Sequence, residues 1–217
     1  MTDRPDRPDR PKLTRRGLLR GFGTVTVIAG CTTPAAEGAN GPASSSNAET
    51  TTENIAQVGP GPAPLKLQIN GVQKTLEVSA ETTLLAALRD HLGLTGSKEV
   101  CDRGACGACM VLIDDVAMNS CMMLAHDAEG RAITTIEGLA SDGELAPLQA
   151  ACIAHDAAQC GFCTSGMLIS ATALLRSGGA TGGPQIARAM AGNLCRCGSY
   201  QHMLAAIQEV ADAQGKA

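Results

Sequence analysis

The chain has 217 residues, which is enough for one or two small domains with a substantial hydrophobic core. Aromatic residues make up only 1% of it, so there is almost nothing on which nucleic-acid bases could stack. Seven of the 17 Lys and Arg residues but only three of the 21 Asp and Glu residues fall within residues 1–30, so the remainder carries 10 basic and 18 acidic residues, a net charge of −8. A nucleic-acid partner is therefore not expected.

Residues 1–31 are predicted to be a twin-arginine signal peptide. Arg15 and Arg16 stand before a weakly apolar segment that is much shorter than the roughly 20 residues needed to cross a bilayer. A basic, unstructured tail is the alternative interpretation. The apolar segment ends in Ile-Ala-Gly-Cys, which resembles a bacterial lipobox with Cys31 as the lipidation candidate, and a cut near Ala36 is the competing outcome. The sequence thus predicts a periplasmic protein, exported folded, either free or tethered to the membrane through Cys31.

Residues 32–63 are predicted to be a flexible linker, because they are rich in Ala, Thr, Ser, Gly and Pro and show no hydrophobic period. The predicted first domain, residues 64–140, opens with apolar and polar residues in alternation. The alternation runs on both sides of Asn70-Gly71 and reaches Val78, which is typical of a β-hairpin.

The next segments complete a small mixed domain around this hairpin. Thr82 or Thr83 can cap a helix with leucines at helical spacing. Those leucines are Leu84, Leu85, Leu88 and Leu92. A strand over Met110–Ile113 turns back at Asp114-Asp115, and a last strand is predicted over Ile133–Ile136. This order of hairpin, helix, cysteine-rich loop and strands fits the β-grasp fold of plant-type ferredoxins.

Four cysteines of this domain have the spacing of a 2Fe-2S ligand set. They are Cys101, Cys106, Cys109 and Cys121, in the C-x4-C-x2-C…C order of plant-type ferredoxins. Small residues fill the gaps between the thiols, which lets the backbone close over a cluster and turn its N–H groups toward the sulfurs. Zinc sites more typically show two C-x2-C pairs, and the four-residue first gap does not fit that pattern.

Residues 141–217 are predicted to form a second domain, a four-helix bundle, which makes the fold class α+β. The predicted helices are Pro147–Ala157, Thr164–Leu175, Pro184–Ala191 and Tyr200–Ala213. Cys160 and Cys163 precede the second helix, and Cys195 and Cys197 precede the fourth. The free N–H groups and the dipole at a helix amino terminus favour an anionic group. A second 2Fe-2S cluster on these four thiols is therefore predicted.

The second set of motifs resembles a known family. Cys-Gly-Phe-Cys-Thr-x-Gly-Met and Gly-Asn-Leu-Cys-Arg-Cys-Gly-x-Tyr, downstream of a plant-type motif, are similar to the small iron-sulfur subunit of the xanthine oxidase family of molybdenum hydroxylases. The resemblance covers residues 64–213 and is greatest to the iron-sulfur subunit of periplasmic aldehyde oxidoreductases, which also begins with a twin-arginine signal. Ser165 stands in place of a usual proline and Val100 in place of a usual glycine, and neither departure removes a ligand.

The resemblance implies partners and a role for the chain. A large subunit would carry molybdenum with molybdopterin cytosine dinucleotide and oxidise an aldehyde with water to a carboxylate. Another subunit would carry FAD, and this chain would relay electrons between the two in a heterotrimer. Gln159 and Cys197 match the family positions that contact the partner's pterin, which places the helical cluster next to molybdenum and the first cluster nearer the flavin or solvent. No residue of this chain is expected to be catalytic.

Two alternatives stay open at this point. The large subunit could hydroxylate an N-heterocycle such as isoquinoline, or another substrate, because that choice is not made on this chain. The cysteines could instead hold zinc or form disulfides in a non-redox binding module.

Other polar and sulfur-containing residues are given structural roles. Cys152 is predicted to be a buried free thiol, and methionines such as Met167 and Met190 to fill the core or a partner surface. Solvated or helix-face positions are predicted for the histidines, His91, His126, His155 and His202. Because Asp102 and Arg103 lie in the first cysteine loop, that loop is predicted to be the more solvated of the two.

Overall fold

The computed structural model describes residues 59–141, 143–178 and 182–215, all of which belong to one structural unit. The predicted signal peptide, Cys31 and most of the predicted linker lie outside these residues. Within the described ranges, no helix combines the length and the apolar character that a membrane span requires.

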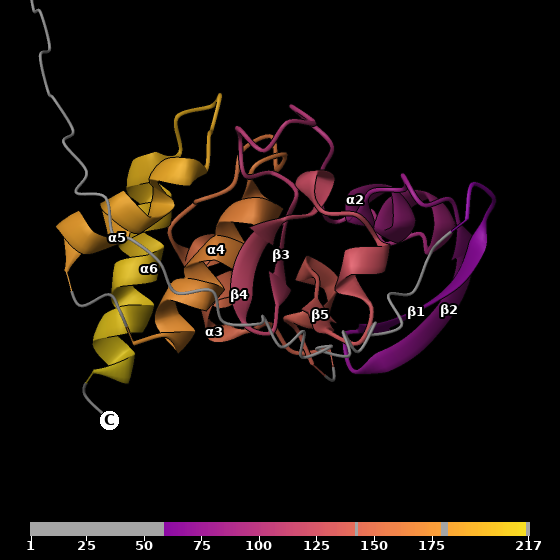
Figure 1. The fold of residues 1–217 in the computed structure, drawn as a ribbon. Helices are drawn as coiled ribbons and strands as arrows, with labels where there is room; N and C mark the ends of the chain where they lie inside the picture. Colours follow the sequence, from indigo (N-terminus) through magenta and orange to yellow (C-terminus); the bar gives the residue numbers. More distant parts are fainter. Residues whose placement is uncertain (1–58, 142, 179–181, 216–217) are drawn as a thin grey trace, which may run out of the picture. The chain divides into compact units, whose positions relative to one another are not determined.

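A five-stranded mixed sheet forms the first half of the described chain (Figure 1). Its strands are β1 (Ala63–Ile69), β2 (Val72–Val78), β3 (Met110–Ile113), β4 (Val116–Asn119) and β5 (Ala132–Thr134), in the spatial order β2-β1-β5-β3-β4. β1 and β5 are parallel, and the other neighbouring strands are antiparallel. The predicted hairpin is confirmed, since Asn70 and Gly71 have positive φ angles of 51° and 78°, as a two-residue turn between twisted strands requires.

A short helical segment packs on this sheet. α2 (Leu84–Ala86) continues into a π-helical turn, η1 (Ala87–His91), and Thr83 caps it by accepting a hydrogen bond from the Ala86 N–H at 3.2 Å. The core of the domain joins its apolar side chains to those of the strands. Members of this core are Leu65, Leu67, Ile69, Leu76, Val78, Leu84, Ala87, Leu88, Val111, Ile113, Ala125, Ala128 and Ile133. The β-grasp domain is therefore confirmed.

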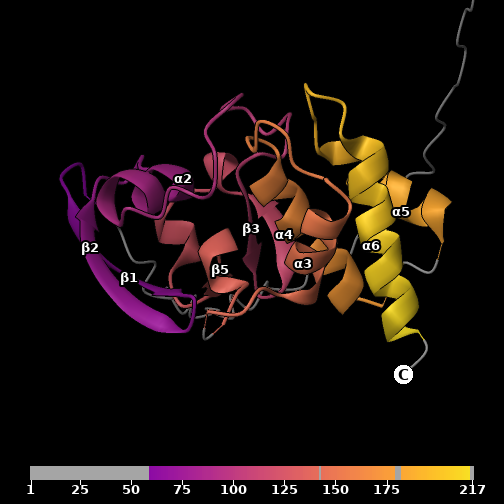
Figure 2. The ribbon, with the colours of Figure 1, turned by 180° about the vertical axis from the view of Figure 1, so that it is seen from behind.

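Helices make up the second half (Figure 2). They are α3 (Pro147–Ala154), α4 (Thr164–Arg176), α5 (Gly183–Ala189) and α6 (Tyr200–Gln214). Short 3₁₀ turns lie in both halves of the described chain. Those of the β-grasp domain are η2 (Ser120–Met122) and η3 (His126–Ala128), and the later ones are η4 (Ile136–Gly138) and η5 (Met190–Gly192). A second core holds the helices together and includes Leu148, Cys152, Met167, Ile186, Met203 and Ile207. The helical domain is confirmed, with α3 packed against α6 and α4 against β3.

The last strand ends earlier than predicted, at Thr134. The N–H of Thr135 donates to Asn70 Oδ1 at 2.9 Å, and the Asn70 amide donates back to Thr135 Oγ1 at 3.0 Å. Because a side chain takes the N–H of Thr135, that N–H does not extend the ladder. The apolar pattern that continues to Ile136 did not contain this information.

α3 also ends early, at Ala154 instead of Ala157. Asp156 has a φ of 50°, and the N–H of Ala157 donates to the carbonyl of Cys152 at 2.9 Å. A left-handed residue followed by this long backward hydrogen bond is the usual way in which a helix is closed. The closure turns the chain toward Cys160.

The two domains meet where α4 lies against β3 and the first cysteine loop. A Cβ built on Gly166 of α4 would overlap the carbonyl oxygen of Gly107, and one built on Gly107 would come within 2.6 Å of Asn193 Nδ2. Asn193 is buried and donates to the Gly107 carbonyl at 3.2 Å. Arg176 at the end of α4 pairs with Asp115 in the β3–β4 turn. Two glycines therefore allow the helical domain to approach the loop closely.

Candidate iron-sulfur centres

The first thiol set consists of Cys101, Cys106, Cys109 and Cys121. The first three lie in the loop before β3, and the fourth lies in η2 directly after β4. In the β3–β4 register Met110 faces Asn119, so the residues just outside this pair are brought together. Ser120 fixes that approach, because its hydroxyl donates to the carbonyl of Cys109 at 2.7 Å. The hairpin thus delivers the distant fourth thiol to the loop.

Within this set the thiols are arranged in two pairs. The Cys106 side chain lies near the Cys101 thiol and affects its pKa, and the Cys121 side chain does the same for Cys109. Backbone N–H groups surround Cys101, with Arg103 making the largest contribution, and together with the Cys106 thiol they lower the pKa of Cys101 to about 7. Burial, by contrast, raises the pKa of Cys109 to about 11.

The second thiol set consists of Cys160, Cys163, Cys195 and Cys197. Its members stand before α4 and α6, and Cys163 is the residue that precedes the first helical residue of α4. The prediction that both cysteine pairs lie at helix amino termini is confirmed. These thiols also form pairs across the two loops, Cys160 with Cys197 and Cys163 with Cys195.

Cys195 is held by Ser199 and Tyr200, for which the sequence predicted no contact with a thiol. Its sulfur lies 3.3 Å from the hydroxyl of Ser199, and its backbone N–H donates to the Tyr200 hydroxyl at 2.7 Å. Burial raises the pKa of Cys195, but hydrogen bonds from the hydroxyl and N–H of Ser199, the Cys163 thiol and the Cys197 N–H together outweigh it and lower the pKa to about 7. Burial raises the pKa of Cys163 to about 12, and the neighbouring Cys195 adds to this. The only signal in the sequence was a Ser-Tyr pair at the predicted start of the last helix.

The donor set fits 2Fe-2S clusters better than single metal ions. Each iron of such a cluster takes two thiolates, and the eight thiols of the two sets stand in pairs. Gly104 and Gly107, at φ angles of 69° and 71°, let the loop turn around the thiols, and the Ala105 N–H donates to Cys101 Sγ at 3.3 Å. The nine described cysteines are all free thiols.

The two thiol sets adjoin each other across the domain boundary. The N–H of Leu194, the residue before Cys195, donates to the carbonyl of Cys106 at 2.9 Å. A small cavity between the loops is lined from both sides, by Cys106 from the first set and Cys160 and Cys163 from the second. A short covalent and hydrogen-bonded route therefore joins a member of one set to a member of the other.

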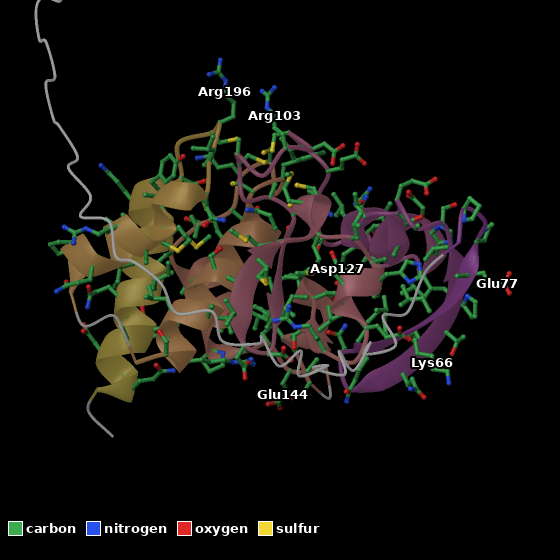
Figure 3. The ribbon with its side chains drawn as sticks, in the orientation of Figure 1. Lys66, Glu77, Arg103, Asp127, Glu144 and Arg196 are labelled. Carbon is green, nitrogen blue, oxygen red and sulfur yellow. The ribbon has the colours of Figure 1, made fainter. Side chains whose placement is uncertain are left out.

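An apolar rim surrounds this junction at the surface. Val100, Phe162 and Leu194 are exposed, although each side chain is apolar. Figure 3 shows Arg103 and Arg196 pointing outward on the same side of the molecule, with sulfur atoms gathered beneath them. Contiguous apolar surface with a charged margin is typical of a protein interface.

The prediction that the first loop is the more solvated one is wrong. Asp102 and Arg103 are exposed, but Cys106, Cys109 and Cys121 are buried, with exposed fractions of 8%, 3% and 6%. The polar side chains point away while η2 closes over the thiols, so that Met122 lies directly against Gly104. In the second set Cys160 and Cys197 are exposed, and so is Gln159.

The other singled-out residues take the structural roles predicted for them, with one difference. Cys152 is buried with its sulfur 3.6 Å from Met203 Sδ, and Met167 and Met190 are in the helical core. His155 and His202 link α3 to α6, through Glu209 at 2.6 Å and the His155 carbonyl at 2.8 Å, and His91 is exposed. The difference is His126, whose Nε2 is buried without a hydrogen-bond partner among the described residues.

Comparison with known proteins assigns both domains. Residues 67–135 match the 2Fe-2S iron-sulfur cluster binding domain, and residues 135–208 match the 2Fe-2S binding domain. The chain is 45% identical over 163 residues to the aldehyde oxidoreductase iron-sulfur-binding subunit PaoA of Escherichia coli (strain K12), a match that covers 68% of this chain and 71% of that subunit.

Two other known proteins match this chain over a similar share of its length. The chain is 45% identical over 152 residues to the nicotine 6-hydroxylase small subunit of Paenarthrobacter nicotinovorans, covering 70% of this chain and 90% of that subunit. It matches the crystal structure of quinoline 2-oxidoreductase from Pseudomonas putida 86 with a TM-score of 0.68 and 41% identity, over 71% of this chain and 95% of that chain. Since both domains bind 2Fe-2S clusters, the zinc or disulfide alternative falls away. The chain belongs to the small 2Fe-2S subunits of the molybdenum hydroxylase family.

Proposed function

We propose that the chain is the electron-transfer subunit of an exported, molybdenum-dependent aldehyde oxidoreductase. When bound, each 2Fe-2S cluster accepts and returns one electron. The observation that carries the relay role is the hydrogen bond from the Leu194 N–H to the Cys106 carbonyl at 2.9 Å. It joins a residue adjacent to Cys195 to a member of the first set, so that the chain itself supplies the contact between the two sites.

The proposed ligands are the eight thiols of the two sets. They are Cys101, Cys106, Cys109 and Cys121 for one cluster and Cys160, Cys163, Cys195 and Cys197 for the other. Backbone N–H groups of Arg103, Ala105 and Phe162 point at sulfurs of these sets and stabilise them as thiolates. The chain's own contribution is thus to hold eight thiolates in place and to keep the two sites in contact.

The proposed partners are a large subunit with molybdopterin cytosine dinucleotide and a subunit with FAD. Oxidation of an aldehyde with water to a carboxylate would release two electrons, and clusters held by the two thiol sets of this chain would carry them singly from the molybdenum subunit to the FAD subunit. The exposure of Gln159 and Cys197 supports their proposed contact with the pterin. The apolar rim of Val100, Phe162 and Leu194 supports a covering subunit at the same place. Together the three chains would form a heterotrimer.

We also propose that the chain is exported to the periplasm by the twin-arginine route. The support is the Arg15-Arg16 pair before a short apolar segment. This route carries folded proteins, which suits a chain whose two thiol sets must enclose their clusters before it crosses the membrane. Cys31 is the proposed point of a lipid tether if the signal is cut before it.

Paramagnetic resonance of the purified complex tests the order of the centres. The Mo(V) signal should be split by the reduced helical cluster, and Cys195→Ser should abolish the splitting while Cys121→Ser leaves it. Iron and acid-labile sulfide in the unaltered complex should each approach four per chain. A splitting that survives Cys195→Ser and disappears in Cys121→Ser would show that the β-grasp cluster, and not the helical cluster, lies next to molybdenum.

A second substrate class has equal support from sequence identity, because the nicotine 6-hydroxylase small subunit is also 45% identical to this chain. The same relay role would then serve hydroxylation of an N-heterocycle. The purified complex with an artificial electron acceptor should turn over aldehydes faster than quinoline, isoquinoline or nicotine. Faster turnover of the heterocycles would replace the aldehyde assignment and leave the relay role unchanged.

A further inference from the structure

We propose that Ser199 raises the reduction potential of the helical cluster by donating a hydrogen bond from its hydroxyl to the sulfur of Cys195. This inference rests on the proposed role of Cys195 as a ligand. The hydroxyl and the sulfur are 3.3 Å apart, and Ser199 is 2% exposed, so water does not compete for the hydroxyl.

Ser199 stands directly before α6, but its hydroxyl does not cap the helix in the usual way. Ser199 is the residue that caps α6, where a serine hydroxyl normally accepts a hydrogen bond from the first turn. It makes no such bond, and α6 begins with the backbone hydrogen bond from the Met203 N–H to the Ser199 carbonyl at 3.0 Å. The hydroxyl is turned to Cys195 instead.

The direction of the hydrogen bond follows from the chemistry of a bound thiolate. A thiolate has no proton, so it can only accept, and the hydroxyl must donate. The contact is held from both sides, because the backbone N–H of Cys195 donates to the Tyr200 hydroxyl at 2.7 Å. Ser199 and Tyr200 are consecutive residues at the start of one helix. Together they fix Cys195 at two points, Ser199 at the sulfur and Tyr200 at the backbone N–H.

A donor at the sulfur favours the reduced cluster. Reduction adds one negative charge, part of which resides on the sulfur ligands, so a hydrogen bond to the sulfur is stronger in the reduced state than in the oxidised one. The potential of the helical cluster therefore rises, which makes it a better acceptor for electrons arriving from the molybdenum side. Ser199 is a positioning and tuning residue, because it acts through Cys195 and not on the substrate.

A redox titration of the intact complex, followed by paramagnetic resonance, tests this inference. In Ser199→Ala the reduced-to-oxidised ratio of the helical cluster at a fixed potential should fall roughly tenfold, which for one electron corresponds to about 59 mV. The potential of the β-grasp cluster should not change. Ser199→Thr, which keeps the hydroxyl, should retain the original potential, and Ser177→Ala at the exposed end of α4 serves as the control substitution.

A second variant and a second signal keep the test decisive if Ser199→Ala assembles poorly. Ser199→Gly also removes the hydroxyl, and glycine is tolerated at a helix cap. In both variants the resonance Raman bands of the Fe–S(Cys) bonds should shift, and the shift that the unaltered complex shows on transfer to D₂O should shrink. An unchanged helical potential in variants that hold four irons per chain would overturn the role of Ser199 alone. Full iron content in Cys195→Ser with unaltered spectra would instead overturn the underlying ligand assignment.

Discussion

At the scale of the residue, Cys152 shows how burial separates a structural thiol from the proposed ligands. Its side chain is 5% exposed, and burial raises its pKa to about 11. At pH 8 only about one Cys152 side chain in a thousand is then ionised, and only the thiolate form reacts with alkylating agents. We expect Cys152 to remain unlabelled by iodoacetamide in the folded protein at pH 8, and labelling to accelerate as the pH rises toward 11.

Peptide mass spectrometry after timed labelling measures this directly. Cys152→Ala should keep the iron content of the unaltered chain, because Cys152 belongs to neither thiol set. Labelling of Cys152 at the rate of a free cysteine, or loss of iron in Cys152→Ala, would contradict the structural role.

Residues that bind a metal cluster are easier to predict from sequence than residues that change its reduction potential. The eight proposed ligands followed from spacing, because a cluster requires thiols at short fixed intervals and thiols are rare. The contact between Ser199 and Cys195 depends on how α6 begins and on the burial of one hydroxyl. A single serine before a helix predicts a cap, and the sequence carries no sign that its hydroxyl is used elsewhere.

At the scale of the element, α4 depends on a glycine for its position. A Cβ at Gly166 would overlap the Gly107 carbonyl and lie 3.0 Å from Ala108 Cα, and both neighbours are backbone atoms that cannot rotate away. We expect Gly166→Ala to push α4 off the first cysteine loop and to lower the free energy of unfolding by about 1–3 kcal/mol. Denaturant unfolding, together with iron per chain, measures both effects.

Gly183→Ala in α5 is the matched control. A Cβ there would meet only Gln208 Oε1, at 4.0 Å, so the free energy of unfolding should change by less than about 0.5 kcal/mol. If Gly166→Ala were as stable as Gly183→Ala and held as much iron, the close approach of α4 to the loop would not be needed.

Prediction of the elements succeeded where the signal was local and failed where it was not. Asn70-Gly71 between alternating residues specified the hairpin, because that signal depends on neighbouring residues alone. Thr82 or Thr83 before the leucines indicated a helix start in the same way, and the structure shows that Thr83 is the cap. The end of β5 depends on Asn70 reaching Thr135, which is 65 positions away. Contacts of that length arise from the completed fold and leave no periodic trace in the sequence.

At the scale of the whole molecule, the proposed export signal can be separated from assembly. Changing Arg15 and Arg16 together to Lys keeps the charge but removes the paired arginines, so the complex should assemble with its iron and remain in the cytoplasm. Cell fractionation followed by immunodetection measures this, and the mass of the mature amino terminus distinguishes acylated Cys31 from a cut near Ala36. Undiminished export of the double variant would refute the twin-arginine route.

The apolar rim leads to a prediction about assembly. Phe162 is 56% exposed beside Cys163, and Phe162→Asp would place a charge in the proposed interface. We expect at least roughly tenfold weaker association with the large subunit, measured by pull-down at graded concentrations, with both clusters still present. Val72→Asp is the control, since Val72 is equally exposed but lies in the hairpin strand β2. Equal association of the two variants would contradict the proposed interface.

The hydrogen bond between the Leu194 N–H and the Cys106 carbonyl has a thermodynamic consequence for how the protein acquires its clusters. A cluster bound by either thiol set orders its loop, and the 2.9 Å hydrogen bond, with Asn193 on the Gly107 carbonyl, transmits that order to the other loop. By linkage, each cluster must then favour the binding of the other to the same degree. During limited reconstitution, native mass spectrometry should therefore find the chain mainly empty or doubly loaded, and Asn193→Ala should allow the singly loaded form to accumulate.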